Sequence, residues 1–233
     1  MKKSKGKYDK VLTFFLIIIF IALIATLGPF IYNEIKTELA IQKGLESFED
    51  TTNSEFETEN EEGNEDEVAE VAKGTLEDIL KELNSDESTL PDEEGSTSSS
   101  NKTINYNPVG KIEIPKTSVN YPIYEDITKA ALEAGVAIAY GVPLNQPGNT
   151  VIYGHNFRNG KFFSNNKKLK SGDMVYITDL EGNKLGYKIY SIYTTTPTDA
   201  NYMIRDTEGR REISLQTCTD DNSKRLIIWA SAD

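Results

Sequence analysis

The sequence predicts a mainly β domain over residues 106–233, either a barrel or a sandwich. Short apolar segments recur there at short intervals, turns rich in Gly, Pro, Asn and Asp separate them, and one convincing helix interrupts them. About 128 residues is an ordinary size for one domain with one core. The seven predicted strands are 109–114, 119–123, 150–153, 174–178, 185–195, 212–217 and 226–230.

The helix is predicted over residues 127–133. Asp126 stands before it as a cap, and Ala130, Ala131 and Ala134 favour it by propensity. A shorter helical turn is predicted at 162–169, so the domain has one or two short helices.

The N-terminus predicts a membrane anchor. Residues 1–10 carry five lysines and one acid, and residues 11–32 carry no charge. A helix over that uncharged run would be roughly 33 Å long, enough to cross a bilayer. A signal peptide is the alternative, but the run is longer than the usual apolar part and no small-x-small cleavage site follows it. The lysines predict a cytoplasmic N-terminus, and therefore a single-pass protein of the plasma membrane with the rest of the chain outside the cell.

Residues 33–105 predict a mostly disordered, extended linker. They hold 22 acidic and 5 basic residues, so the net charge of −12 belongs to this segment. Such a composition cannot bury enough apolar surface to offset the entropy of ordering. Residues 75–83 are an exception, since Thr75 can cap a helix with four apolar residues on one face. That helix is either transient, because it is short, or a lid on the C-terminal domain.

The C-terminal domain is nearly neutral. Residues 106–233 hold 15 basic and 14 acidic residues. No basic field is present to attract nucleic acid.

The same domain contains the only histidine and the only cysteine of the chain. His155 ends an apolar run at Gly154, and Cys218 ends the strand 212–217. Arg225 comes seven residues later and begins the apolar strand 226–230. If these last two strands are antiparallel neighbours joined by residues 219–224, the guanidinium returns to the thiol. An inert buried cysteine is the alternative, but the surrounding motif argues against it.

These three side chains suit acyl transfer. A free thiol has a pKa of about 8.5, so a cysteine nucleophile needs an imidazole or a cation beside it. His155 can take or give that proton. Arg225 is always charged and offers fixed donors to a developing oxyanion.

In these motifs the chain resembles the sortases, the cell-wall transpeptidases of Gram-positive bacteria. The resemblance covers residues 106–233 and implies a closed β-barrel of about eight strands. It is carried by an ordered set of motifs: Gly154-His155, Phe163-Ser164, residues 169–175, Leu215-x-Thr217-Cys218, and Arg225 ahead of Leu226-Ile227-Ile228.

The resemblance implies a role for each residue of the set. Cys218 is the nucleophile that forms a thioacyl intermediate, His155 is the general acid or base, and Arg225 stabilises the oxyanion. The family cuts a sorting signal of the Leu-Pro-x-Thr-Gly kind between Thr and Gly and passes the acyl group to an amine. The implied partners are surface proteins that carry the signal, and an amine on a peptidoglycan precursor or a pilin lysine. No cofactor is implied.

Residues near these motifs are weaker candidates for substrate binding. In the family, the loop before the cysteine strand, here about 196–211, forms part of the groove, and Tyr202 and Met203 could line it. Local packing explains such residues at least as well. Thr217 is either a substrate contact or simply a β-branched strand residue.

Nearby acids give no firm metal site. Asp220 and Asp221 could orient a base or bind a cation, but a solvated turn explains them better. Some members of the family bind calcium, and Glu125, Asp126 and Glu133 lie in a plausible region. Their spacing is not that of a tight calcium loop, so no metal is predicted.

Three alternative functions are open to the sequence. Pilin-polymerising sortases commonly carry an Asp-Pro-aromatic lid and a second hydrophobic segment, and this chain shows neither, which favours wall anchoring. A secreted thiol protease would use water as acceptor, but the order of His before Cys and the presence of Arg225 differ from papain-like enzymes. A pure peptide-binding module would have no use for an exposed thiol. The sequence selects no subclass, sorting signal, acceptor or oligomeric state.

Overall fold

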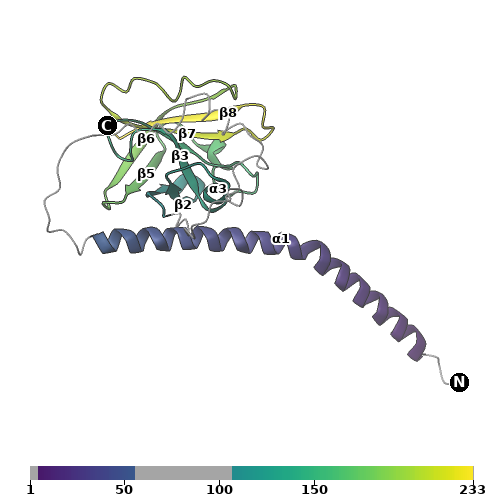
Figure 1. Cartoon of the computed structure of the whole chain (residues 1–233). Helices are drawn as coiled ribbons and strands as arrows, with labels where there is room; N and C mark the ends of the chain where they lie inside the picture. The colour runs from purple at the N-terminus through teal and green to yellow at the C-terminus, as the bar shows by residue number, and fades with distance from the viewer. Residues whose placement is uncertain (1–4, 56–106, 233) are drawn as a thin grey trace, which may run out of the picture. The chain divides into compact units, whose positions relative to one another are not determined.

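The chain combines one long helix with a closed barrel (Figure 1). A computed structural model describes residues 5–55 and 107–232. Two compact units are present, Met1–Ala40 and Ile41–Asp233.

The helix α1 (Lys5–Glu55) contains the predicted anchor. Within the described residues, Leu12–Asn53 is the one helical segment long and apolar enough to cross a membrane, with a mean hydropathy of 2.8 in its most apolar part. Large apolar side chains along it are exposed, among them Phe20 at 64%. Such exposure is expected of a surface that faces lipid.

The helix is longer than the sequence predicted. Residues 33–55, which the sequence assigned to the extended linker, continue α1, so that assignment is wrong for this stretch. Glu, Lys and Leu, which are good helix formers, are frequent here, and extending an existing helix avoids the cost of nucleation. The rest of the predicted linker, with the short helix at 75–83, lies outside the described residues.

Eight strands close into the barrel, which confirms the predicted fold class. Their order around the barrel is β1-β2-β3-β4-β7-β8-β6-β5. The pairs β2–β3 and β4–β7 are parallel, and the other six pairs are antiparallel. The strands are β1 (Gly110–Ile114), β2 (Val119–Tyr124), β3 (Val136–Gly141), β4 (Gly148–Tyr153), β5 (Met174–Asp179), β6 (Lys184–Thr195), β7 (Arg211–Cys218) and β8 (Arg225–Ser231).

Seven of these strands were predicted to within two residues at each end. The strand β3 was not predicted, because its alanines extend the helix-favouring composition that precedes it. The helix α3 (Lys129–Ala134) begins two residues later than predicted, and its cap is Thr128 rather than Asp126. The amide of Ala131 donates to Thr128 Oγ1 at 3.1 Å. The predicted turn at 162–169 contains a short 3₁₀ helix, η3 (Asn166–Lys168), and a second one, η2 (Pro115–Thr117), follows β1.

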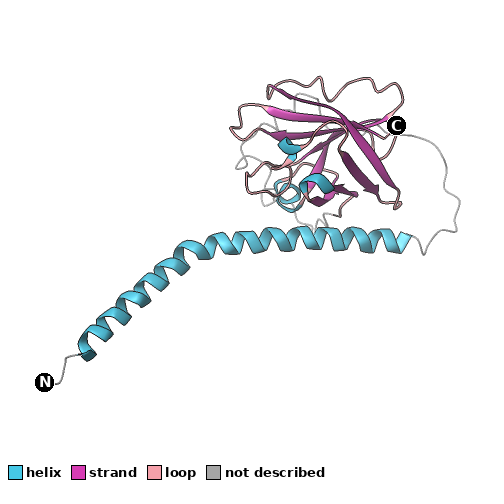
Figure 2. Cartoon of the chain, turned by 180° about the vertical axis from the view of Figure 1, so that it is seen from behind, coloured by secondary structure: helices cyan, strands magenta, loops and turns pink. Residues whose placement is uncertain are grey.

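Apolar side chains pack on both faces of the barrel wall. Because successive strand residues point to opposite faces, Ile152 packs inside the barrel while Val151 and Tyr153 pack outside it. The outer cluster includes Ala131 and Leu132 of α3. Figure 2 shows how little helix the barrel part contains beside its strands and loops. The inner core is formed by residues such as Ile112, Ile114, Ile123, Val175, Ile177, Ile189, Ile213 and Leu215.

Candidate active site

Two parallel neighbouring strands bring the histidine and the cysteine to the same end of the barrel. In the β4–β7 pair, Tyr153 lies opposite Gln216, so both strands end at one edge. The amide of Gly154 donates to the Gln216 carbonyl at 3.2 Å, which continues the pairing beyond β4. His155 therefore follows the end of β4 beside Cys218, the last residue of β7.

The arginine comes from the antiparallel neighbour of β7. Cys218 and Arg225 are direct partners in the β7–β8 register, and the Thr219 amide donates to the Lys224 carbonyl at 3.0 Å across the turn that joins the strands. Directly opposed residues have Cβ atoms about 4.5–5.5 Å apart. The predicted antiparallel pairing of the two strands is confirmed, and it places Arg225 across from Cys218. Arg225 is buried, with 5% of its surface exposed.

A tyrosine that the sequence analysis did not select connects the thiol and the imidazole. The Tyr153 hydroxyl lies 3.4 Å from Nδ1 of His155 and 4.0 Å from Sγ of Cys218. Both reactive groups therefore contact one oxygen atom. The signal was present in the sequence, because a residue two positions before His155 in an extended chain points to the same face.

The surroundings of His155 keep its imidazole neutral at pH 7. Its ring lies 4.5 Å from the ring of Phe157 and 5.6 Å from that of Tyr153, measured between centroids. Burial lowers the pKa of His155 to about 4, because the charged form loses its hydration. A neutral imidazole can accept a proton from a thiol, which a protonated one cannot.

The glycine before the histidine is required by close packing. A Cβ atom on Gly154 would lie 2.7 Å from the ring of Phe163 and 2.9 Å from Val136 Cγ1. The Phe163 amide also donates to the His155 carbonyl at 3.0 Å. The segment after β4 therefore folds back on the strand end and fixes the backbone on both sides of His155.

A polar bracket joins the segment after the histidine to the segment after the cysteine. The side-chain amide of Asn156 donates to the Cys218 carbonyl at 2.9 Å and to Asp220 at 3.0 Å. Lys167 pairs with Asp220 at 2.5 Å, and the hydrogen bonds from Lys167 and Asn156 lower the pKa of the Asp220 carboxyl. Asp220 thus has two specific partners, Lys167 and Asn156, whereas the sequence favoured a solvated turn without such partners. Asp221 lies within that turn and accepts from Thr219 Oγ1 at 2.6 Å.

The weaker substrate-binding candidates are all buried. Tyr202 and Met203 are each 1% exposed and pack in the outer apolar cluster. Their positions favour the packing alternative over an open groove surface. Thr217 is 2% exposed, and its hydroxyl has no hydrogen-bond partner among the described residues. It alternates with Cys218 and so belongs to the inner face of β7.

No metal cluster converges within the described residues. Across 5–55 and 107–232, no group of three or more His, Cys, Asp or Glu side chains could hold an ion. Glu125, Asp126 and Glu133 are among the residues covered.

Comparison with known proteins identifies the family of this fold. The family profile described as "Sortase domain" matches residues 112–233, more than half of the chain. The chain belongs to the sortase family. The match covers β2 to β8 and includes His155, Cys218 and Arg225.

Curated sortases are the relatives found by sequence. The chain is 32% identical to Sortase A of Bacillus anthracis over 123 residues, which cover 52% of this chain and 57% of that protein. It is 34% identical to Sortase A of Staphylococcus aureus over 124 residues, which cover 52% and 59%. The chain thus spans somewhat more than half the length of these relatives.

Solved sortase structures share the barrel. Sortase A from Corynebacterium diphtheriae superimposes with a TM-score of 0.51 at 26% identity, over 68% of this chain and 84% of that one. Sortase C-1 from Actinomyces oris gives 0.50 at 25% identity, over 68% and 93%.

Proposed function

We propose that this sortase is a membrane-anchored cysteine transpeptidase that cleaves a Leu-Pro-x-Thr-Gly-like sorting signal of secreted proteins and joins the acyl part to an amine. The observation that carries the proposal is the contact of Cys218 Sγ and His155 Nδ1 with the same Tyr153 hydroxyl, beside Arg225. Nucleophilic catalysis is the function that best explains a thiol, an imidazole and a guanidinium at the same end of the barrel.

The first half of the reaction forms a thioester. The neutral imidazole of His155 accepts the thiol proton, and Sγ of Cys218 attacks the carbonyl carbon of the Thr–Gly bond. Arg225 donates to the oxyanion of the tetrahedral intermediate, which stabilises charge as it develops. The C–N bond then breaks, and the imidazolium gives its proton to the leaving glycine amine.

The second half transfers the acyl group. An incoming primary amine attacks the thioester carbon, and His155 takes the proton that the amine loses. The C–S bond breaks, and Cys218 leaves as the thiolate, which the imidazolium reprotonates. A thiol protease would differ only in using water here, so the acceptor decides between the two functions.

The anchor supports a location at the outer face of the plasma membrane. The lysine-rich N-terminus and the exposed apolar stretch of α1 favour a single span with residues 1–10 in the cytoplasm. The catalytic domain would then meet secreted proteins and the amine of a peptidoglycan precursor outside the cell.

Intact-mass analysis of the detergent-solubilised chain with a Leu-Pro-x-Thr-Gly peptide library tests the proposal. The expected result is an acyl adduct that Cys218→Ala abolishes and that a small amine releases as a transfer product. Absence of any adduct across the library would overturn the proposed substrate class. Hydrolysis in the presence of excess amine would favour the protease.

A pilin-polymerising role is the second candidate, supported by the likeness of the barrel to sortase C-1 from Actinomyces oris. The two roles differ in acceptor. A lysine-containing pilin-motif peptide and an amine that mimics a peptidoglycan cross-bridge, offered in competition, would show which is used.

A further inference from the structure

The segment between β6 and β7 is fixed to the barrel wall by buried polar contacts. Residues 196–210 connect the end of β6 to the start of β7. The side-chain amide of Asn149, on β4, donates to the carbonyls of Tyr202 at 3.1 Å and Met203 at 2.9 Å. The Tyr202 side chain lies beneath the segment and donates to Gln216 at 2.8 Å. The segment therefore covers the outer face of β4 and β7.

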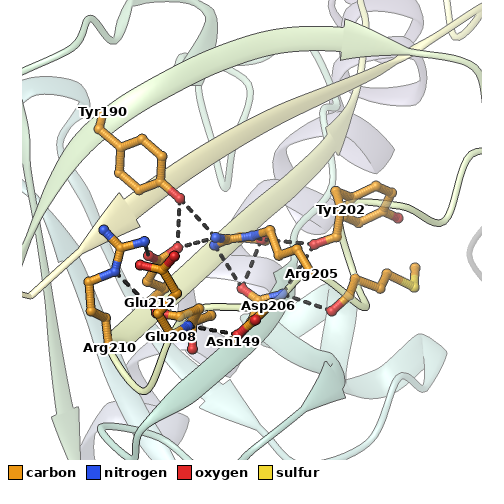
Figure 3. Close-up of polar contacts among 11 residues, drawn as sticks. Asn149, Tyr190, Tyr202, Arg205, Asp206, Glu208, Arg210 and Glu212 are labelled. Atoms are coloured by element: carbon orange, nitrogen blue, oxygen red, sulfur yellow. Dashed lines mark hydrogen bonds and ion pairs between the residues drawn. The ribbon is translucent and has the colours of Figure 1, made fainter.

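Arg205, a residue of this segment, makes several further contacts with the same face of the barrel (Figure 3). Its guanidinium forms an ion pair with Glu212 and donates to the Tyr190 hydroxyl at 2.8 Å. It also donates to Asn149 Oδ1 at 3.1 Å, the amide whose nitrogen holds the segment's backbone. The carbon at the centre of the guanidinium lies 4.6 Å from the centroid of the Trp229 ring, in a cation–π contact.

Glu212 makes this arrangement dependent on a cation. Its side chain is 0% exposed, and it receives Arg205 on one oxygen and Arg210, at 3.1 Å, on the other. A carboxylate in such a place is tolerated only when it is paired and hydrogen-bonded. Arg205 is itself mostly buried, with 12% of its side chain exposed, whereas Arg210 is half exposed. The inner pair is therefore the one shielded from water.

The same face of β7 leads from Glu212 to the thiol. Because strand residues alternate, Glu212, Ser214, Gln216 and Cys218 point outward together. Ser214 donates to Asn149 at 2.9 Å, and Gln216, which holds Tyr202, lies opposite Tyr153 in the register. A row of polar contacts thus runs from Arg205 through Asn149, Ser214 and Tyr202 to Gln216, the register partner of Tyr153.

We propose that Arg205 is a positioning residue that holds the 196–210 segment in its folded form before any substrate binds, so that the peptide meets a preformed wall. This inference rests on the proposed function and deepens it: Arg205 sets the binding of the sorting peptide and takes no part in the chemistry at Cys218. A lysine could keep the charge but not the several directed contacts of the planar guanidinium.

Arg205→Lys and Arg205→Met test the proposal in the full detergent-solubilised chain. Hydrogen exchange over residues 196–210 is expected to become at least tenfold faster, while the barrel strands keep their protection. The KM for the peptide that wild type cleaves is expected to rise about tenfold with kcat within about threefold, since a loose wall weakens binding more than chemistry. Alkylation of Cys218 by iodoacetamide is expected to proceed at the wild-type rate.

Two further variants separate the proposed role from general stability. Arg205→Met with Glu212→Gln removes the buried carboxylate, which would otherwise keep Arg210 as its only cation and could prevent folding. The segment of this double variant is still expected to exchange fast. Arg210→Met removes a cation from the same carboxylate but leaves the contacts to Asn149 and Tyr190, so a smaller change is expected. Hydrogen exchange over 196–210 at the wild-type rate in the double variant would overturn the proposal. A fall of kcat in Arg205→Lys as large as the rise of KM would also overturn it. If wild type cleaves no peptide, the proposed function fails, and the exchange rates still decide whether Arg205 orders the segment.

Discussion

Cys218 and Arg225 face each other as direct partners in the β7–β8 pair, with a six-residue turn between them. The guanidinium is buried, and it is the one cation placed by strand register, rather than by a loop, at the proposed nucleophile among the described residues. A fixed donor at this place suits an oxyanion that exists only briefly.

Arg225→Lys is therefore expected to lower kcat for peptide cleavage by roughly 10²-fold, because the ammonium keeps the charge but cannot present the same fork of donors. The fall in kcat is measured by steady-state kinetics on the peptide that the intact-mass experiment identifies. Thermal unfolding of the variant serves as control, since Arg225 is buried. A variant of unchanged kcat would exclude a role for Arg225 in the transition state.

Tyr153→Phe removes the one hydroxyl that contacts both the thiol and the imidazole and keeps the volume of the ring. We expect kcat to fall by about 2- to 10-fold, the equivalent of one hydrogen bond of roughly 0.5–1.5 kcal/mol. The rate of Cys218 alkylation should change with it, since the hydroxyl touches the sulfur. If kcat and the alkylation rate both equal those of wild type, the Tyr153 hydroxyl does not contribute to catalysis.

The buried imidazole predicts a pH dependence of stability. The pKa of His155 is lowered to about 4, while an unfolded imidazole has a pKa of about 6.5. Between these values the unfolded chain binds more protons, so the contribution of His155 is present above about pH 6.5 and is lost as the pH falls toward 4. Urea unfolding at pH 4.5 and 7.5 should show wild type losing about 1–3 kcal/mol more than His155→Gln. Equal losses in the two proteins would contradict the buried neutral imidazole.

The single cysteine also makes the proposed topology testable. A membrane-impermeant maleimide should label Cys218 on intact cells, because the catalytic domain is expected outside the membrane. Lys7→Cys combined with Cys218→Ser provides the matched control, which should react only after lysis. The opposite labelling pattern would place the catalytic domain in the cytoplasm.

Sequence reasoning reached the barrel and three residues of its candidate site because those signals are local. Turn residues mark the strand ends, and His155 and Cys218 are unique in the chain. The strand β3 escaped it, since alanine favours a helix until pairing with β4 in the folded barrel overrides that preference.

The contacts that depend on distant segments could not be predicted. Tyr153 reaches Cys218, and Arg205 reaches Asn149, only after the parallel β4–β7 pair has formed. No periodicity within one strand reveals which neighbour covers it. The sequence left Tyr202 and Met203 open between a substrate groove and local packing, and their burial favours packing.

The two ion pairs at opposite ends of the outer face of β7 respond differently to ionic strength. Arg205 and Glu212 are enclosed by protein, where counterions hardly reach, whereas Lys167 and Asp220 are each half exposed at the rim. Added sodium chloride should therefore weaken the Lys167–Asp220 pair beside the turn that follows Cys218, while the Arg205–Glu212 pair is retained. Under the proposed function, high salt would therefore lower kcat and leave the KM for the peptide nearly unchanged.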